Sequence, residues 1–217
     1  MSRYEIRFVP FRKASKRESQ TSYDEIQNWL GTTKKRNSNV SQVSKYVVRK
    51  FASSDAESFY AAVRESIDEL TYWMPWCSKD YAFSDAKNWI KTSIDFWANN
   101  TEYPLGIFDA STGAVIGGTG INHINRANRI GNIGYWVSSP YTGQGVARFA
   151  AHQAALLGFG ELGLTRLEIV VLTHNLASQR VAMSLGAKLE CEARNRLYFH
   201  GAPHDALVYS LVPGDVL

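Results

Sequence analysis

The sequence around residues 135–148 constrains the fold of this chain most strongly. Tyr135-Trp136-Val137 is typical of a strand, and it leads into a loop with glycines at 143 and 145. Residues 144–162 are rich in Ala, Leu and Phe, as expected of a buried helix. Glycines let a backbone approach a ligand closely, and the first N–H groups of a helix lack partners within it. The pattern therefore predicts an α/β fold in which the start of a helix holds an anion such as a pyrophosphate.

This candidate anion-binding segment differs from two better-known phosphate-binding loops. It is not a Walker loop, because no Lys-Ser/Thr pair follows the glycines, and it lacks the third glycine of a dinucleotide-binding fingerprint. Because Gly-x-Gly also occurs in plain turns, the spacing alone leaves a turn without a ligand equally open. The candidate contacts are the backbone amides of Thr142, Gly143, Gln144, Gly145, Val146, Ala147 and Arg148.

Hydrophobic periodicity divides most of the 217 residues into strands and helices. Strands are expected at 46–51, 103–108, 114–121, 130–137, 167–172, 189–199 and 206–211, and helices at 53–66, 84–98, 144–162 and 177–185. Short turns join the three strands between 103 and 137, which predicts an antiparallel meander. A helix connects the next strand to them, so the sheet should become partly parallel. We expect one α/β domain with a mixed sheet flanked by helices.

The net charge of +4 conceals a basic N-terminal segment. Residues 1–50 contain twelve Lys/Arg and four Asp/Glu, whereas the remaining residues contain twelve and sixteen. We therefore divide the chain into a basic appendage, 1–44, with a short amphipathic helix at 23–30, and a compact domain, 45–217. A basic segment can bind nucleic acid, ribosomes or an acidic membrane, but such segments are more often only solvated.

Other features of the sequence argue against several classes of protein. No apolar run approaches the ~20 residues that a membrane span needs, and the first residues form no apolar signal core, so we expect a cytoplasmic protein that does not bind membranes. Cys77 and Cys191 are too few for a disulfide framework and are expected to be reduced thiols. His200 and His204 straddle a turn without a completing set of ligands, so no metal is expected.

A second motif follows the strand expected at 167–172. It begins with Asn175-Leu176-Ala177-Ser178 and ends with Gly186-Ala187. Together with the loop at 142–147, this motif makes the chain resemble the GNAT superfamily of acetyltransferases, and within it the RimJ/RimL-type branch that acetylates the N-termini of ribosomal proteins. Two positions depart from the pattern of that family: Thr142 replaces the usual Arg or Gln, and Ala187 replaces the usual Phe.

The resemblance covers about residues 46–212, and it implies a GNAT fold with six to seven twisted strands. It also implies acetyl-CoA as cosubstrate and a primary amine as acceptor, either a protein N-terminus or a small molecule. A bulge at 135–137 is expected to splay strand 4 from strand 5, so that the pantetheine arm enters between them. The N–H near Val137 would then polarise the thioester carbonyl, and Asn175 would hydrogen-bond the pantetheine amides. A homodimer is left open.

The departing thiolate needs an acid or a hydrogen-bond donor. The resemblance implies that a serine at this place, or a tyrosine elsewhere, lies near the cofactor sulfur, so Ser178 is the candidate catalytic residue. The alternative is that its side chain only caps the first turn of its helix. The general base is not identified, since the ribosomal branch often has a Glu where this chain has Leu197. The remaining candidates are Glu168, Glu190, Glu192, His123 and a water relay.

Four tryptophans divide into two groups. Trp73 and Trp76 flank a proline in an expected loop, and the resemblance implies that this loop lines the acceptor pocket. Trp89 and Trp97 are assigned to the core of the helix at 84–98, which Ser84 is expected to cap. Two other functions stay open: a catalytically silent acyl-CoA-binding module, and a nucleic-acid-binding protein that uses its basic segment.

Overall fold

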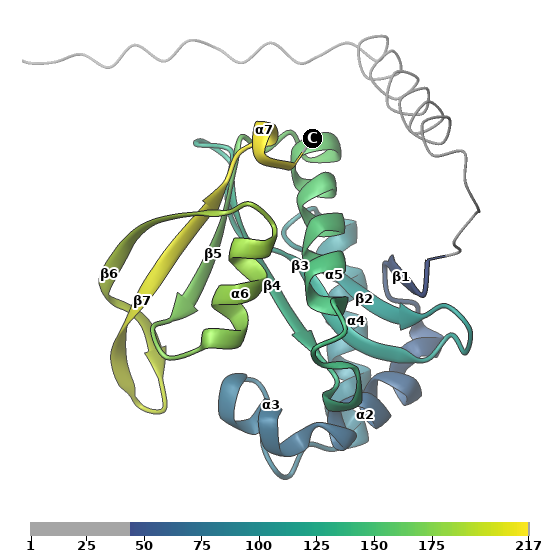
Figure 1. Cartoon of the computed structure of the whole chain (residues 1–217). Coiled ribbons are helices and arrows are strands. Elements are labelled where there is room, and N and C mark those ends of the chain that lie inside the picture. Colours follow the sequence, from purple (N-terminus) through teal and green to yellow (C-terminus); the bar gives the residue numbers. More distant parts are fainter. Residues whose placement is uncertain (1–43, 217) are drawn as a thin grey trace, which may run out of the picture. The chain divides into compact units, whose positions relative to one another are not determined.

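The computed structural model describes residues 44–216 (Figure 1). The expected basic appendage up to residue 43, with its helix at 23–30, lies outside the described residues. Seven strands form one sheet with the order β1-β2-β3-β4-β5-β7-β6. They are β1 (Tyr46–Arg49), β2 (Tyr103–Asp109), β3 (Val115–Asn125), β4 (Ile130–Val137), β5 (Arg166–Leu172), β6 (Lys188–Phe199) and β7 (Ala202–Leu211). Neighbouring strands are antiparallel except for the parallel pair β4 and β5, which confirms the predicted mixed sheet.

Helices cover both faces of the sheet. In Figure 1, α5 and α6 lie in front of the sheet, and α2 and α4 lie behind it. The helices are α2 (Ala56–Glu65, preceded by the 3-10 turn η1, Ser53–Asp55), α3 (Ile67–Trp73), α4 (Phe83–Asn99), α5 (Val146–Leu156, continued by the π-helical turn η3, Leu157–Glu161), α6 (Leu176–Ser184) and α7 (Pro213–Val216). The four expected helices are confirmed. The sequence did not predict α3 and α7, because each is too short to show a periodic pattern.

The start of α4 differs from the prediction. Ser84 does not cap this helix, which begins one residue earlier, at Phe83. The Asp85 carboxylate instead accepts a hydrogen bond from the Ala82 N–H at 2.8 Å. A carboxylate in the first turn also suits the positive end of the helix dipole, so Asp85 performs the stabilising role expected of Ser84.

The two tryptophans of α4 have different environments. Trp97, assigned to the core, is partly buried and packs against the core cluster, and its Nε1 donates to the Pro104 carbonyl at 2.7 Å. Trp89 is 38% exposed, so its assignment to the core is wrong. The buried residues of α4 are at 86, 90 and 93, and position 89 lies beside this stripe rather than within it.

β4 and β5 separate along their length, as the resemblance implied. Their pairing covers only residues 130–132 of β4 and 166–168 of β5. Beyond this stretch, β4 stays paired with β3 up to Val137, and β5 stays paired with β7 up to Leu172. Both strands therefore continue in regular conformation while the space between them widens. We term this space the β4–β5 opening.

The predicted cause of this opening, a bulge in β4, is wrong. Residues 117–122 of β3 pair with residues 132–137 of β4 without interruption, and the irregularity lies beyond them, near His123 of β3. The end of β4 keeps its regular pairing because the Ser138 N–H donates to the Ile116 carbonyl at 2.8 Å. Beyond residues 132 and 168, β4 pairs only with β3 and β5 pairs only with β7.

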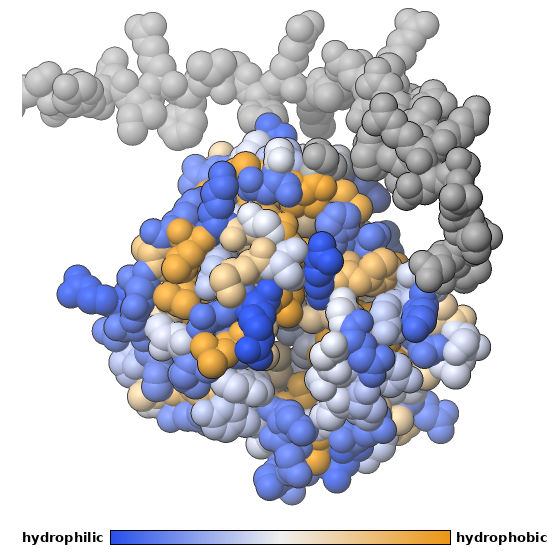
Figure 2. Space-filling view, viewed as in Figure 1, coloured by the Kyte–Doolittle hydropathy of each residue, from blue (hydrophilic) through white to orange (hydrophobic). Residues whose placement is uncertain are grey.

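The face that carries α5 and α6 mixes hydrophilic and hydrophobic residues (Figure 2). Two exposed apolar side chains of α6 are Leu176, at 60%, and Met183, at 54%. Single exposed apolar side chains are ordinary on a protein surface. Within residues 44–216, no helix combines the length and the apolar composition needed to cross a membrane.

Candidate active site

The loop before α5 presents a row of free backbone N–H groups. Gly145 is the N-cap of α5 with φ 79°, and Gly143 has φ 73°, so both lie in the left-handed region that disfavours a side chain. No atom lies within 4 Å of the position that a Cβ would take at either glycine. In the described part of the chain, no N–H group of residues 143–148 has a hydrogen-bond acceptor. The loop therefore combines unpaired donors with open space.

The side chains of this loop turn back to the protein. Thr142 and Gln144 donate to the backbone carbonyls of residues 139 and 140, each at 2.8 Å, and Arg148 donates to the carbonyl of residue 184 at 3.0 Å. The helix begins at Val146 instead of Gln144, so its positive end lies at the glycines. The N–H of Thr142, named among the candidate contacts, is not free, because it donates to the Ser139 carbonyl at 3.2 Å. Because the remaining donors are backbone amides, Thr142 in place of Arg or Gln leaves this arrangement intact. It suits an anion.

The N–H of Val137 faces the β4–β5 opening. Successive residues of an antiparallel strand direct their N–H groups to opposite sides. The Ser138 N–H donates to the Ile116 carbonyl of β3, so the N–H of its predecessor Val137 points away from β3. On that side β5 has already separated from β4. Val137 thus offers the free donor that the resemblance implied.

Ser178 lies in the first turn of α6, and its side chain does not cap this helix. Asn175 is the N-cap, and its Oδ1 accepts a hydrogen bond from the Ser178 N–H at 3.1 Å. This bond leaves the Nδ2 of Asn175 available as a donor. The Ser178 hydroxyl lies 3.0 Å from the hydroxyl of Tyr135 on β4. The capping alternative for Ser178 is therefore wrong.

Tyr135 is a residue of the site that the sequence analysis did not single out. Its hydroxyl also donates to the Ser178 carbonyl at 3.1 Å. Burial raises the pKa of Tyr135 to about 12, so the phenol stays protonated at neutral pH. Successive side chains of a strand point to opposite faces of the sheet, so Tyr135 lies on the same face as Ile133, two residues before it. Because Ile133 packs in the core beneath α5 and α6, the strand pattern could have indicated Tyr135.

Two of the candidate general bases are held in ion pairs. Arg166 contacts Glu190 at 2.6 Å and Glu168 at 3.1 Å, and Arg196 contacts Glu168 at 3.6 Å. The hydrogen bonds from Arg166 and from Ser210 lower the pKa of Glu190 to about 2. A carboxylate with such a pKa is a weak base, so Glu190 does not fit the role.

The other two candidates also lie away from the opening. Glu192 is exposed on β6, the strand at the edge of the sheet. His123 has φ 49° and lies near the irregularity of β3, at the opposite end of the β3–β4 ladder from Val137. Leu197, at the expected position of the glutamate, pairs with His204 of β7. None of the three carboxylates and the one imidazole named from the sequence fits the role of general base.

Trp73 and Trp76 lie on two sides of the β4–β5 opening. Trp73 is the last residue of α3, not part of a loop, and its ring centroid lies 6.3 Å from that of Phe199 on β6. Trp76 is 46% exposed, and its ring lies 6.1 Å from Trp136 on β4. Neither tryptophan belongs to a buried core cluster. The end of α3 and the turn after it thus reach from β6 to β4.

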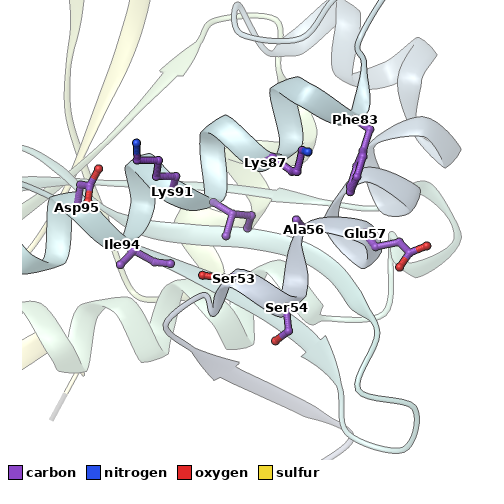
Figure 3. A pocket seen from close by; sticks show the side chains of 10 residues that line it. Ser53, Ser54, Ala56, Glu57, Phe83, Lys87, Lys91, Ile94 and Asp95 are labelled. Atoms are coloured by element: carbon purple, nitrogen blue, oxygen red, sulfur yellow. The ribbon is translucent and has the colours of Figure 1, made fainter.

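A surface cavity elsewhere has no part in this site. It has a volume of about 490 Å³ and lies between α4 and the start of α2 (Figure 3). Its lining includes Phe83, Ile94 and the lysines Lys87 and Lys91. No residue expected to bind cosubstrate or amine lines this cavity. The described residues also contain no group of three or more His, Cys, Asp or Glu that could hold a metal ion.

Comparison with known proteins agrees with this arrangement. A family model described as an acetyltransferase (GNAT) domain matches residues 45–188. An uncharacterized N-acetyltransferase, YoaA of Bacillus subtilis (strain 168), is 28% identical over 171 residues, which are 79% of this chain and 95% of the relative. Ribosomal-protein-S5-alanine acetyltransferase from Vibrio fischeri is 26% identical, with a TM-score of 0.71 over 82% of this chain and 100% of that chain. RimL, a ribosomal L7/L12 α-N-protein acetyltransferase solved with coenzyme A, is 20% identical and shares the fold, with a TM-score of 0.70 over 80% and 97%.

A mixed sheet opened between two parallel strands, with a glycine loop at the start of the next helix, defines an acyltransferase of the N-acetyltransferase class. The chain belongs to the GNAT acetyltransferase family. Its structural neighbours include ribosomal-protein acetyltransferases. The family, fold and enzyme class expected from the sequence are thereby confirmed.

Proposed function

We propose that this enzyme binds acetyl-CoA and transfers the acetyl group to the α-amine of a protein N-terminus. The pyrophosphate lies on the free amides of residues 143–148, and the pantetheine arm lies in the β4–β5 opening. One observation carries the proposal: the free amides of the loop, the free N–H of Val137 and the hydroxyl of Ser178 all belong to the elements that border this opening. These donors, arranged along the opening, suit a ligand with an anion at one end and a thioester at the other.

Each of these residues has a separate task in the proposed reaction. Acetyl-CoA supplies an acetyl group activated as a thioester. Asn175 donates from Nδ2 to a pantetheine carbonyl, because its Oδ1 is occupied by the Ser178 N–H. The Val137 N–H stabilises the negative charge that develops on the carbonyl oxygen, and the Ser178 hydroxyl donates to the departing sulfur.

The proposed acceptor is a peptide with a free N-terminus. Structural neighbours described as acting on the alanine of ribosomal protein S5 and on the N-terminus of L7/L12 support this choice. Trp73 and Trp76 support it as well, since they provide apolar walls on both sides of the opening. A small-molecule amine is the alternative acceptor.

A thiol-release assay tests the proposal directly. Peptides with free N-terminal alanine or serine are compared with N-terminally blocked copies of the same sequence, at fixed acetyl-CoA. Small-molecule amines are assayed in parallel. Turnover of the free peptides alone supports the proposal, and turnover of the small amines alone would identify a small-molecule amine as the acceptor. Acetyl-CoA binding without turnover of any amine would indicate a silent acyl-CoA-binding module instead.

A further inference from the structure

Three histidines surround one aromatic ring beside the β4–β5 opening. Phe199, the last residue of β6, is buried. Its ring centroid lies 4.1 Å from that of His200, 5.8 Å from His204 and 6.1 Å from His174. The ring of Trp73 lies 5.6 Å from His174, at 30° between the ring planes. We term these five residues the imidazole cluster. None of the base candidates named from the sequence belongs to it.

Among the three histidines, His174 is closest along the chain to the proposed chemistry. It lies in the short connection between β5 and α6, directly before the N-cap Asn175. The His174 carbonyl accepts a hydrogen bond from the Leu176 N–H at 3.0 Å, and the Asn175 side chain accepts one from the Ser178 N–H in the same turn. The backbone turn that positions Ser178 therefore also positions His174.

The surroundings of His174 suit a group that accepts a proton. The side chain is exposed, and no ion pair within residues 44–216 involves a histidine. No carboxylate therefore forms an ion pair with this ring. The face of Trp73 would stabilise the cation that forms on proton uptake, because an aromatic face attracts a positive charge within about 6 Å. The ionisable groups near the ring are His200 and His204 of the β6–β7 hairpin and Tyr72 of α3, which lies 5.2 Å from His200.

We infer that His174 is the general base that takes the proton from the attacking amine. The inference rests on the proposed function. His174 takes one proton from the α-ammonium of the acceptor, and the neutral amine nitrogen then bonds to the acetyl carbonyl carbon and gives a second proton to solvent. The carbon–sulfur bond breaks, and the sulfur takes the proton of the Ser178 hydroxyl. His174 then releases its proton to solvent and Ser178 regains one from solvent, so the products are a neutral amide and a thiol.

The test compares His174→Gln with two control variants in the full chain. His204→Gln and His200→Asn alter the other imidazoles of the cluster, and asparagine tolerates the φ of 47° at position 200. Thiol release with a free N-terminal alanine peptide is measured from pH 6 to 9.5, together with the thermal shift caused by acetyl-CoA. We expect His174→Gln to lower kcat at pH 7 by ~100-fold or more. The controls should stay within about threefold of wild type, well below the ~100-fold effect of a catalytic group.

The pH dependence separates a lost base from a structural defect. The deficit of His174→Gln should shrink above about pH 8, because the α-amine is then deprotonated in solution. Added imidazole should restore part of the rate at pH 7, and the acetyl-CoA thermal shift should remain.

Four results would overturn the inference. An unchanged pH profile of kcat in His174→Gln would reject His174 as the base. So would a ~100-fold loss of kcat in His204→Gln with none in His174→Gln. Either result would leave the proposed acetyltransferase function standing. Loss of the thermal shift together with the activity would assign His174 a structural role. A wild-type protein that binds acetyl-CoA but acetylates no peptide or amine would remove the proposed function, and the base with it.

Discussion

The Tyr135 hydroxyl lies 3.0 Å from the Ser178 hydroxyl and 3.1 Å from the Ser178 carbonyl. This pair joins β4 to the first turn of α6 across the β4–β5 opening. Tyr135 has a single hydroxyl proton. When it donates this proton to the Ser178 carbonyl, the Ser178 hydroxyl donates to Tyr135, and when it donates to the Ser178 hydroxyl, the serine proton is available. The arrangement suits a serine that donates to a departing sulfur.

Replacing Ser178 with alanine should reduce turnover far more than cosubstrate binding. A proton donor to the sulfur acts mainly in the transition state, so we expect kcat to fall by ~100-fold or more with the Kd for acetyl-CoA nearly unchanged. Ser184→Ala is a matched control, because Ser184 ends the same helix and its hydroxyl donates only to the Val181 carbonyl. A kcat for Ser178→Ala within about twofold of wild type would assign the proton transfer to another group.

Tyr135 should also govern part of the alkaline stability. Burial raises its pKa to about 12, whereas an unfolded tyrosine titrates near 10. The contribution is complete below about pH 10. Above it the unfolded chain loses its proton first, so the free energy of unfolding falls by about 1.4 kcal/mol per pH unit for this one group. Tyr135→Phe should therefore show a shallower fall between pH 10 and 12 in denaturant titrations. Equal slopes for variant and wild type would contradict the buried phenol.

Gly145→Glu should abolish cosubstrate binding. The glycine has φ 79° and open space at its Cβ position, so the substitution strains the turn and places a carboxylate beside the free amides. Differential scanning fluorimetry with and without CoA measures the effect, because a ligand selective for the folded state stabilises it by about 2.7 kcal/mol at a hundredfold excess over its Kd.

A second glycine provides the charge control for this experiment. Gly160 is also free of atoms within 4 Å, has no positive φ and lies in η3 at the other end of the helix. Gly160→Glu adds the same charge and should retain the CoA-induced shift. A shift that survives in Gly145→Glu would remove the loop from the proposed site.

Trp73→Ala and Trp76→Ala should weaken the binding of the acceptor peptide and not that of acetyl-CoA. Both rings lie beside the β4–β5 opening and outside the buried core clusters, so we expect a raised KM for the peptide with little change in acetyl-CoA affinity. Trp89→Ala, on the exposed side of α4, is the control and should change neither. A large fall in Tm with joint loss of both ligands would return these tryptophans to a structural role, since truncating a buried Trp costs ~3–5 kcal/mol.

The sequence predicts those parts of the site that depend on local backbone chemistry. A left-handed turn favours glycine, so Gly143 and Gly145 predict the turn before α5 at which the anion site is proposed. The sequence could not reveal that Tyr135 meets Ser178, because this contact depends on how β4 and α6 pack together. Two predictions from the sequence are wrong. The helical pattern places Trp89 in the core, but a shift of one residue along a helix moves a side chain out of the buried stripe. The resemblance places a bulge in β4, but β4 pairs regularly with β3 where it separates from β5.

The central claim is tested most directly by mass spectrometry of the reaction products. The enzyme, acetyl-CoA and a peptide with a free N-terminal alanine are incubated together, and acetylated peptide and released CoA thiol are quantified in the same samples. The account predicts equal amounts of the two products, with the acetyl group on the α-nitrogen. CoA release without acetylated peptide, or neither product despite an acetyl-CoA-induced thermal shift, would contradict it.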